Sequence, residues 1–385
     1  MSSAATTGVW SELLGQDEAV SQLQLAVKHR DEGVHHAWLL TGPPGSGRSN
    51  LAHAFAAALL CPEGGCGTCH SCHLAEVGTH PDISVLATDK VTITIDEVRK
   101  LVADSQFGGS MGRFRIMIIE DADRMAERSS NVLLKALEEP PSGTIWLLCA
   151  PSEADMLPTI RSRVRRVGLK VPSIEQVAQL LVQRDGVDQK LALEVAAAAQ
   201  SHIGMARRLA TSHEARSRRR ESLLAALNIT SVPAAINTAE QWLEVARKDA
   251  EMLTAQRDEQ ERAELLRSMG LSAGDTVPPA LRSEVKNLEE AQKRRATRSL
   301  RDGLDRILVD LLALYRDVLT IQLAAKTPLV NEDLRTQIQS VASRSNATET
   351  IAKLDAIAQT RIRIDANVRD AIALEALAVK LRTKP

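Results

Sequence analysis

The feature that most restricts the fold of this chain is a glycine-rich turn between an apolar run and a helical stretch. The turn spans Gly42–Ser49 (GPPGSGRS), after an expected strand at Ala37–Thr41 and before an expected helix at Ser49–Leu60. Its G-x-x-x-x-G-[K]-[ST] spacing is typical of a phosphate-binding loop, in which glycines turn backbone N–H groups inward and the helix N-terminus adds positive charge. Its candidate nucleotide-binding residues are Gly42, Gly45, Gly47, Arg48 and Ser49.

Two features of this predicted nucleotide site differ from those of working ATPases. Arg48 stands in the lysine position, and a planar guanidinium does not replace a compact ammonium between phosphates. Glu120 and Asp121 follow another apolar run in the reverse of the usual order, which is Asp for Mg²⁺ and then Glu for water. Because a misplacement of about 1 Å can cost on the order of a hundredfold in rate, we expect no productive ATP binding. An ordinary strand-to-helix turn and acids that only solvate a strand end are the alternatives.

The pattern of apolar runs predicts a parallel sheet followed by helices. In the first 170 residues short apolar runs alternate with helical patterns, as in α/β domains. Further strands are expected at Ile83–Ala87, Arg115–Ile119 and Ile145–Ala150, and a helix is expected at Ser129–Glu139, before two prolines that end it. From Ser173 onward the pattern is helical, with expected helices at Ile174–Gln183 and Gln189–Ala199, and a turn-rich break at Gly270–Pro279.

Composition and charge exclude several classes of protein. A chain of 385 residues forms about two or three domains. With 48 Lys and Arg against 49 Asp and Glu, it does not hold nucleic acid through its net field, and 2% aromatic residues cannot build a stacking platform. It has no apolar stretch of about 18 residues and no signal-peptide pattern at its start, so we expect a cytoplasmic protein with reduced cysteines.

Four cysteines within twelve residues predict a metal site. Their spacing is C-x₄-C-x₂-C-x₂-C, and the ligands would be Cys61, Cys66, Cys69 and Cys72. Four thiolates this close in a cytosolic chain indicate a closed, tetrahedral structural zinc site. His70 or His73 could replace one ligand, and unpaired thiols or an iron–sulfur cluster are the alternatives. Cys149 lies within an expected strand and should be a core residue.

A pair of arginines follows the last expected strand, at Arg161 and Arg163 in the sequence RSR. An exposed arginine can reach across an interface and stabilise charge on a neighbour's γ-phosphate, an effect worth about 10³ to 10⁵ in rate in GTPases. A surface arginine without such a role is the simpler alternative.

Together these motifs resemble the bacterial clamp-loader subunits of the AAA+ superfamily. The resemblance is carried by the glycine-rich turn, the cysteines, Thr79–Asp82 (THPD), Asn131–Pro141 (NVLLKALEEPP) and the arginine pair. It is close over residues 8–170, extends to about 212 through Gly204–Arg207, and is weak beyond. It implies a RecA-like AAA+ domain over 1–170 with a zinc module at 61–72, a helical lid over 171–212, and an all-helical oligomerisation domain, or collar, over 213–385.

The resemblance also implies a function. A non-motor subunit would hold together the heteropentameric DNA polymerase III clamp loader, which uses ATP to place a sliding clamp on primed DNA in replication. Its partners would be gamma/tau and delta subunits, with the clamp contacted indirectly and primed DNA inside the complex. Without ATPase activity of its own, it would still be part of the DNA polymerase holoenzyme.

Individual residue roles follow from the same resemblance. Arg163, rather than Arg161, matches the arginine finger that acts in trans on a neighbouring ATPase subunit, although Val164 replaces the family's cysteine. Arg207 matches a second nucleotide-sensing arginine, and Ala150 and the following proline stand where active members carry a polar sensor.

Several alternatives stay open from the sequence. An active ATPase, either gamma/tau-like or a related DNA-processing AAA+ enzyme, is the main one, and a zinc-dependent DNA-binding module is another. The basic run Arg216–Arg220 could contact DNA phosphates, although a charged helix surface or a subunit contact is the preferred interpretation. Lys135 and the pair Glu138-Glu139 are expected on a solvated helix face.

Overall fold

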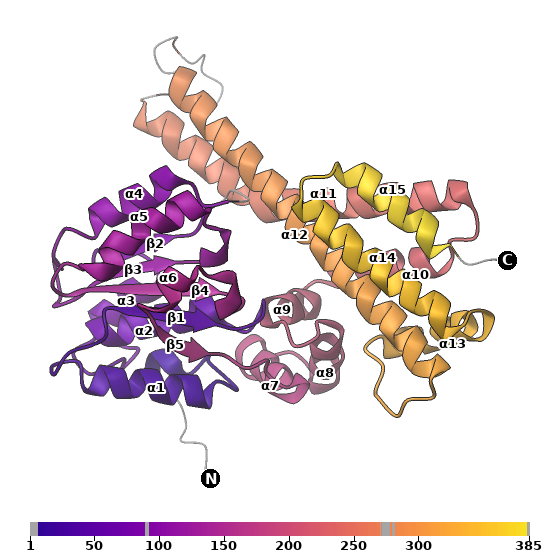
Figure 1. The fold of residues 1–385 in the computed structure, drawn as a ribbon, viewed down its shortest axis with the longest axis horizontal. Helices are drawn as coiled ribbons and strands as arrows, with labels where there is room; N and C mark the ends of the chain where they lie inside the picture. The colour runs from indigo at the N-terminus through magenta and orange to yellow at the C-terminus, as the bar shows by residue number, and fades with distance from the viewer. Residues whose placement is uncertain (1–6, 89–91, 270, 272–277, 279–281, 383–385) are drawn as a thin grey trace. The chain divides into compact units, whose positions relative to one another are not determined.

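The chain divides into two compact units, Met1–Thr211 and Ser212–Pro385 (Figure 1). The computed structural model describes residues 7–88, 92–269, 271, 278 and 282–382. The expected turn-rich segment Gly270–Pro279 lies outside the described residues, apart from Leu271 and Pro278. Within these described ranges, none of the helices has both the length and the apolar composition needed to span a bilayer.

A five-stranded parallel sheet forms the centre of the first unit, which confirms the expected α/β fold. The strands lie in the order β2-β3-β4-β1-β5, and each neighbouring pair is parallel. Four of them match expected strands to within one residue at either end: β1 (Ala37–Thr41), β2 (Ile83–Leu86), β3 (Arg115–Ile119) and β4 (Thr144–Ala150).

The fifth strand, β5 (Arg165–Gly168), was not expected from the sequence. It pairs with β1 at the edge of the sheet, where Trp38 lies opposite Arg165. Only Val167 of this strand is buried, so no apolar run marks it. The Arg165 guanidinium lies over the Trp38 ring at 5.1 Å, which supports the edge pairing by a cation–π contact.

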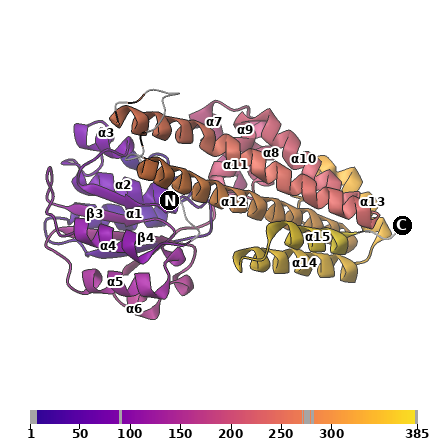
Figure 2. The same cartoon turned by 90° about the horizontal axis from the view of Figure 1, so that it is seen from above.

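Helices cover both faces of the sheet, giving three layers (Figures 1 and 2). Alternate residues of β1 face opposite layers, as a strand's period of two requires. Trp38 and Leu40 pack in one apolar cluster with α1 (Asp17–Lys28) and α2 (Arg48–Leu60), and Leu39 packs in a second cluster on the other face. The second cluster includes α4 (Ile95–Asp104), α5 (Glu127–Glu138) and α6 (Pro158–Arg161), while α3 (His70–Glu76) packs on α2.

Three helices complete the first unit: α7 (Ile174–Asp185), α8 (Gln189–Ala198) and α9 (Ile203–Thr211). A capping box between Ser173 and Gln176 starts α7, and Gly186 ends it in the left-handed conformation at φ +65°. α7 and α8 match the two expected helices to within two residues, whereas α9 was not predicted, and the division into two units falls after Thr211. The expected separate domain over 171–212 stays a prediction.

The second unit is entirely helical in its described residues. It contains the helices α10 (His213–Leu227), α11 (Val232–Ser268), α12 (Arg282–Gln322), α13 (Arg335–Arg344), α14 (Ala347–Asp365) and α15 (Asp370–Leu381). Trp242 and Tyr315 are fully buried in its core. α11 and α12 lie side by side and antiparallel, and their far ends extend beyond α13, α14 and α15 (Figure 2).

The basic run in α10 is used for contacts inside this unit. Arg218 Nε lies 3.0 Å from a carboxylate oxygen of Asp249, and Arg219 Nε lies 3.3 Å from one of Asp310. Arg220 pairs with Asp333, just before α13. These pairs favour the interpretation of a structural helix surface over that of a DNA-phosphate contact.

A buried carboxylate ties the segment after α12 to the core. Asp317 is fully buried and accepts hydrogen bonds from the backbone N–H of Val330 at 3.0 Å and of Asn331 at 2.8 Å. The side-chain amide of Asn331 donates to the same carboxylate at 2.9 Å, and its carbonyl accepts from Arg219 at 2.7 Å.

We expect Asp317→Ala to lower the free energy of unfolding by about 2–4 kcal/mol, because it leaves two buried donors of Asn331 and one partly buried donor of Val330 without an acceptor. Urea unfolding followed by circular dichroism measures this loss. Asp355→Ala is the matched control, since Asp355 is exposed on α14 and its removal should change stability by less than about 0.5 kcal/mol. Equal effects of the two substitutions would contradict the assigned role of Asp317.

Candidate functional site: a cysteine cluster and a phosphate-binding loop

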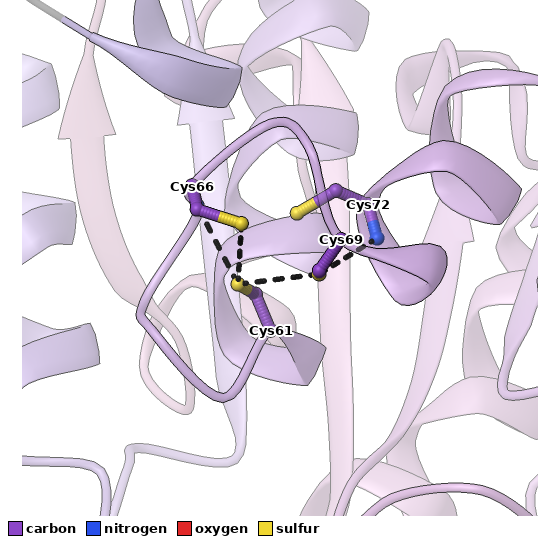
Figure 3. Close-up of side chains that lie close together, drawn as sticks. All are labelled: Cys61, Cys66, Cys69 and Cys72. Atoms are coloured by element: carbon purple, nitrogen blue, oxygen red, sulfur yellow. Dashed lines mark hydrogen bonds between the residues drawn. The ribbon is translucent and has the colours of Figure 1, made fainter.

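The four predicted cysteine ligands converge at one place between α2 and α3 (Figure 3). Cys61 directly follows α2, and Cys66 lies in the loop between α2 and α3. Cys69 caps the start of α3, and Cys72 lies in the first turn of that helix. The four sulfur atoms lie within 4.8 Å of one another. Cys61 Sγ is 3.7 Å from both Cys66 Sγ and Cys69 Sγ.

This geometry fits a tetrahedral metal ion. Zinc–sulfur bonds of about 2.3 Å place the corners of a tetrahedron about 3.8 Å apart, close to the two sulfur–sulfur distances of 3.7 Å. The cluster consists of cysteines alone, so neither histidine is needed as a substitute ligand. Four soft donors and no open position are the pattern of a structural site rather than a catalytic one.

The electrostatics of the cluster favour thiolates at two positions. Hydrogen bonds from the backbone N–H and the hydroxyl of Thr68 lower the pKa of Cys66 to about 6. Burial acts to raise the pKa of Cys61, but backbone hydrogen bonds to its sulfur outweigh burial and lower it. Burial raises the pKa of Cys72, so a cation is needed to bring that thiol into its ligating form.

The loop that carries Cys66 is closely packed against the start of the described chain. A Cβ at Gly8 would lie 2.1 Å from the carbonyl oxygen of Gly65, and Val9 donates its backbone N–H to that oxygen at 3.1 Å. Gly65 has φ +109°, which other residues rarely adopt. Arg30 closes the other side by donating to carbonyls at the end of α2, including that of Cys61 at 2.5 Å. The cysteine module is therefore part of the unit's packing.

The glycine-rich loop has the backbone of a phosphate-binding loop. Gly45 and Gly47 have φ +81° and +91°, and α2 begins at the next residue, with Ser49 half-buried in its first turn. A Cβ at Gly45 would lie 2.3 Å from Cγ of His202, so the imidazole that precedes α9 covers this part of the loop.

The side chain in the lysine position turns back onto its own loop. Arg48 donates to the carbonyl oxygen of Gly42, and its Nη2 lies 3.7 Å from Oδ1 of Asp121. It is only 11% exposed. Glu120, the other acid after β3, has its carboxylate 3.5 Å from Nε2 of His53 on α2. Both acids therefore face basic side chains of α2.

The remaining nucleotide-site residue also has a partner in the chain. Arg207 on α9 donates through Nε to Oδ1 of Asp185 at 2.9 Å, and Asp185 accepts a second hydrogen bond from Arg184. At the end of β4, Cys149 is buried, and burial raises its pKa to about 12. It is a neutral core thiol, as expected.

Arg163 lies just after α6 and is held by three contacts. Its Nη1 donates to the carbonyl of Thr159 at 2.8 Å and to the hydroxyl of Ser162 at 3.0 Å. Its Nη2 lies 2.6 Å from Oε1 of Glu138, the last residue of α5. Glu138 is 47% exposed, so it lies on a solvated face as expected, but it also forms an ion pair.

The THPD motif has a structural role that its sequence did not indicate. Asp82 is fully buried and accepts four hydrogen bonds from the segment before β3. The donors are the backbone N–H groups of Ser110, Met111 and Gly112 and the Ser110 hydroxyl. His80 receives the backbone N–H of Asp82 and contacts Ser71 on α3 at 3.1 Å. Sequence reasoning also missed His202 and Asp185, which no motif spacing marks.

Comparison with known proteins shows that part of the first unit is similar to DNA polymerase III subunits. Residues 15–173 match the family described as DNA polymerase III, delta subunit. The DNA polymerase III subunit delta' of Pseudomonas aeruginosa is 37% identical over 170 residues, 41% of this chain and 52% of that protein. The Escherichia coli subunit delta' is 36% identical over 157 residues, 39% of this chain and 47% of that protein.

A tau/gamma subunit of DNA polymerase III and a solved structure also match. The tau/gamma subunit of Haemophilus influenzae is 31% identical over 177 residues, 45% of this chain and 25% of that protein. The chain thus spans about half the length, or less, of these curated relatives. A gamma subunit-related protein from Thermotoga maritima has a TM-score of 0.42 at 16% identity, covering 94% of this chain and 98% of that one.

We expect Cys69→Ser to abolish stoichiometric zinc binding and to lower the unfolding temperature, because metal binding free energy is folding free energy in such sites. Metal content by mass spectrometry and thermal unfolding measure both effects. Cys149→Ala is the control: it removes a buried cysteine of the same unit but should leave one zinc ion per chain. Wild-type protein that binds no zinc when refolded with it would contradict the metal site.

Proposed function

Because residues 15–173 match the family described as DNA polymerase III, delta subunit, and are similar to delta' subunits, we propose that this chain is a non-motor subunit of a bacterial clamp loader. In this role it holds the pentamer together while the complex loads the sliding clamp onto primed DNA. Its partners are the gamma/tau ATPase subunits and the delta subunit. The cysteine cluster holds a structural zinc ion.

The observation that carries the non-motor assignment is the position of the Arg48 side chain. It is bound to Gly42 and lies beside Asp121, the second of the two acids that follow β3. A bound nucleotide would have to displace a nearly buried guanidinium from both partners and His202 from Gly45. These contacts support a nucleotide site that is filled by the chain's own side chains.

The contribution to catalysis is then made in trans. Arg163 lies at the surface of the first unit, with 35% of its side chain exposed. We assign it as the arginine finger that stabilises charge on the γ-phosphate of ATP held by a neighbouring gamma/tau subunit. Arg161 has its Nε buried, which suits a packing role.

Exposed aliphatic side chains on the last two helices support the assembly role. They are Ile351 and Ile362 on α14, and Ile372 and Val379 on α15, with exposed fractions of 48%, 58%, 55% and 39%. Exposed apolar side chains are available for contact with a partner's surface. In our proposal neighbouring clamp-loader subunits cover these four side chains.

An active ATPase is the second candidate, because a tau/gamma subunit matches over 177 residues and the loop backbone keeps its shape. Mg²⁺-ATP binding separates the two candidates. We expect the isolated, zinc-loaded protein to give no saturable calorimetric signal with Mg²⁺-ATP and no phosphate release. Binding together with turnover would move the protein to the motor class.

We expect Arg163→Ala to leave folding and assembly intact and to reduce ATP hydrolysis by the assembled complex. The lost fraction of the ATP hydrolysis rate should equal the fraction contributed by the one ATP site that Arg163 serves. In our proposal the other ATP sites of the complex are served by arginines of other subunits. Phosphate release per assembled complex measures it, and Arg161→Ala serves as the comparison variant with unchanged turnover. Loss of assembly with normal turnover per complex would contradict the finger role.

A further inference from the structure

The proposed finger is already bound inside its own chain. Its Nη2 lies 2.6 Å from the Glu138 carboxylate, while Nη1 is bound to oxygens of its own turn, those of Thr159 and Ser162. Glu138 is also the last residue of α5, where the helix C-terminus adds negative charge. The guanidinium therefore lies in an anionic environment that its own subunit supplies.

Packing fixes both partners of this ion pair. Leu137, next to Glu138, is 1% exposed, and Ile160, three residues before Arg163, is fully buried. The two lie in the same apolar cluster. The last turn of α5 is held further by His36, whose Nε2 lies 2.9 Å from the carbonyl oxygen of Leu137. The contact thus joins the end of α5 to the turn that follows α6.

While Arg163 is paired with Glu138, it cannot offer both of its terminal nitrogens to a phosphate. A guanidinium recognises phosphate best through two parallel N–H bonds, and here one of the two terminal nitrogens is bound to a carboxylate. A γ-phosphate brought to the surface by a neighbouring subunit carries more negative charge than one carboxylate. It can therefore take Arg163 from Glu138 once the interface is formed.

We propose that Glu138 is a positioning residue that retains Arg163 in the unengaged subunit and releases it when a neighbouring subunit presents nucleotide. This inference rests on the finger role proposed above. Glu138 does not touch the nucleotide; it sets how readily the finger becomes available.

The expected effect is small because the pair is partly exposed, at 35% for Arg163 and 47% for Glu138. Exposed ion pairs hold weakly, so releasing the finger should raise kcat by about two- to fivefold. The KM for ATP should change little, since the finger acts on charge that develops in the transition state.

The test uses the complete clamp-loader complex, assembled with gamma/tau and delta subunits from the same source. Steady-state ATP hydrolysis is measured with wild type, Glu138→Gln, Arg163→Ala and the double variant. Glu138→Gln keeps the shape of the side chain and removes its charge. We expect it to raise kcat in the wild-type background and to have no effect when Arg163 is alanine.

Glu153→Gln is the matched control. It removes a carboxylate of similar exposure from another arginine of the same unit, Arg166, and should leave kcat unchanged. Glu138→Asp keeps the charge on a shorter side chain and should give an intermediate rate. Assembly is checked for each variant by the mass of the complex.

The outcomes separate the two proposals. If Arg163→Ala lowers kcat but Glu138→Gln leaves it unchanged or lowers it, retention by Glu138 is overturned and the finger role stands. If Glu138→Gln changes kcat equally with and without Arg163, Glu138 acts by another route and the inference fails. If Arg163→Ala has no effect, the finger role itself is wrong, and the inference falls with it.

Discussion

The parallel sheet brings Arg48 and Asp121 together, and their contact lies where a nucleotide would bind to the first unit. A parallel sheet brings the ends of β1 and β3 to one edge, where a phosphate-binding loop and a pair of acids lie within reach of each other. In this chain a guanidinium lies between them, bound to the loop carbonyl of Gly42 and beside the carboxylate. The polar groups at the edge that would face a nucleotide are thereby paired with other groups of the same chain.

The other candidate residues follow the same principle. Glu120 faces His53 and Arg207 is bound to Asp185. Each of these charged side chains would have to give up an internal partner before it could meet a ligand. Arg163 differs because its partner, Glu138, lies at the surface and the pair is partly exposed. In our proposal it is the residue that a neighbouring subunit engages.

The sequence predicted those parts of the structure that depend on local patterns. Four strands and the helix after the phosphate-binding loop are marked by apolar runs and by glycines. The cysteine cluster was predictable because its ligands lie within twelve residues and the chain must fold back on itself there. β5 carries a single buried residue, Val167, so its place in the sheet depends on pairing with β1 rather than on its own composition.

Contacts between distant positions were beyond such reasoning. The Arg163–Glu138 pair and the cover of Gly45 by His202 join residues far apart in sequence, and no spacing rule links them. The antiparallel pair of α11 and α12 is a similar case. Arg295 on α12 is 7% exposed and pairs with Asp258 and Glu261 on α11, where an apolar seam would be expected.

Such a buried ion pair contributes little net stability, because desolvation of the charges offsets their attraction. It does penalise any shift in the register of the two helices, since a shift would leave a buried arginine without its carboxylates. Charged residues in this chain thus act mainly by excluding alternatives. Arg295 disfavours other registers of a helix pair, and in our proposals Arg48 keeps nucleotide out of the loop and Glu138 retains Arg163 until a neighbouring subunit engages it.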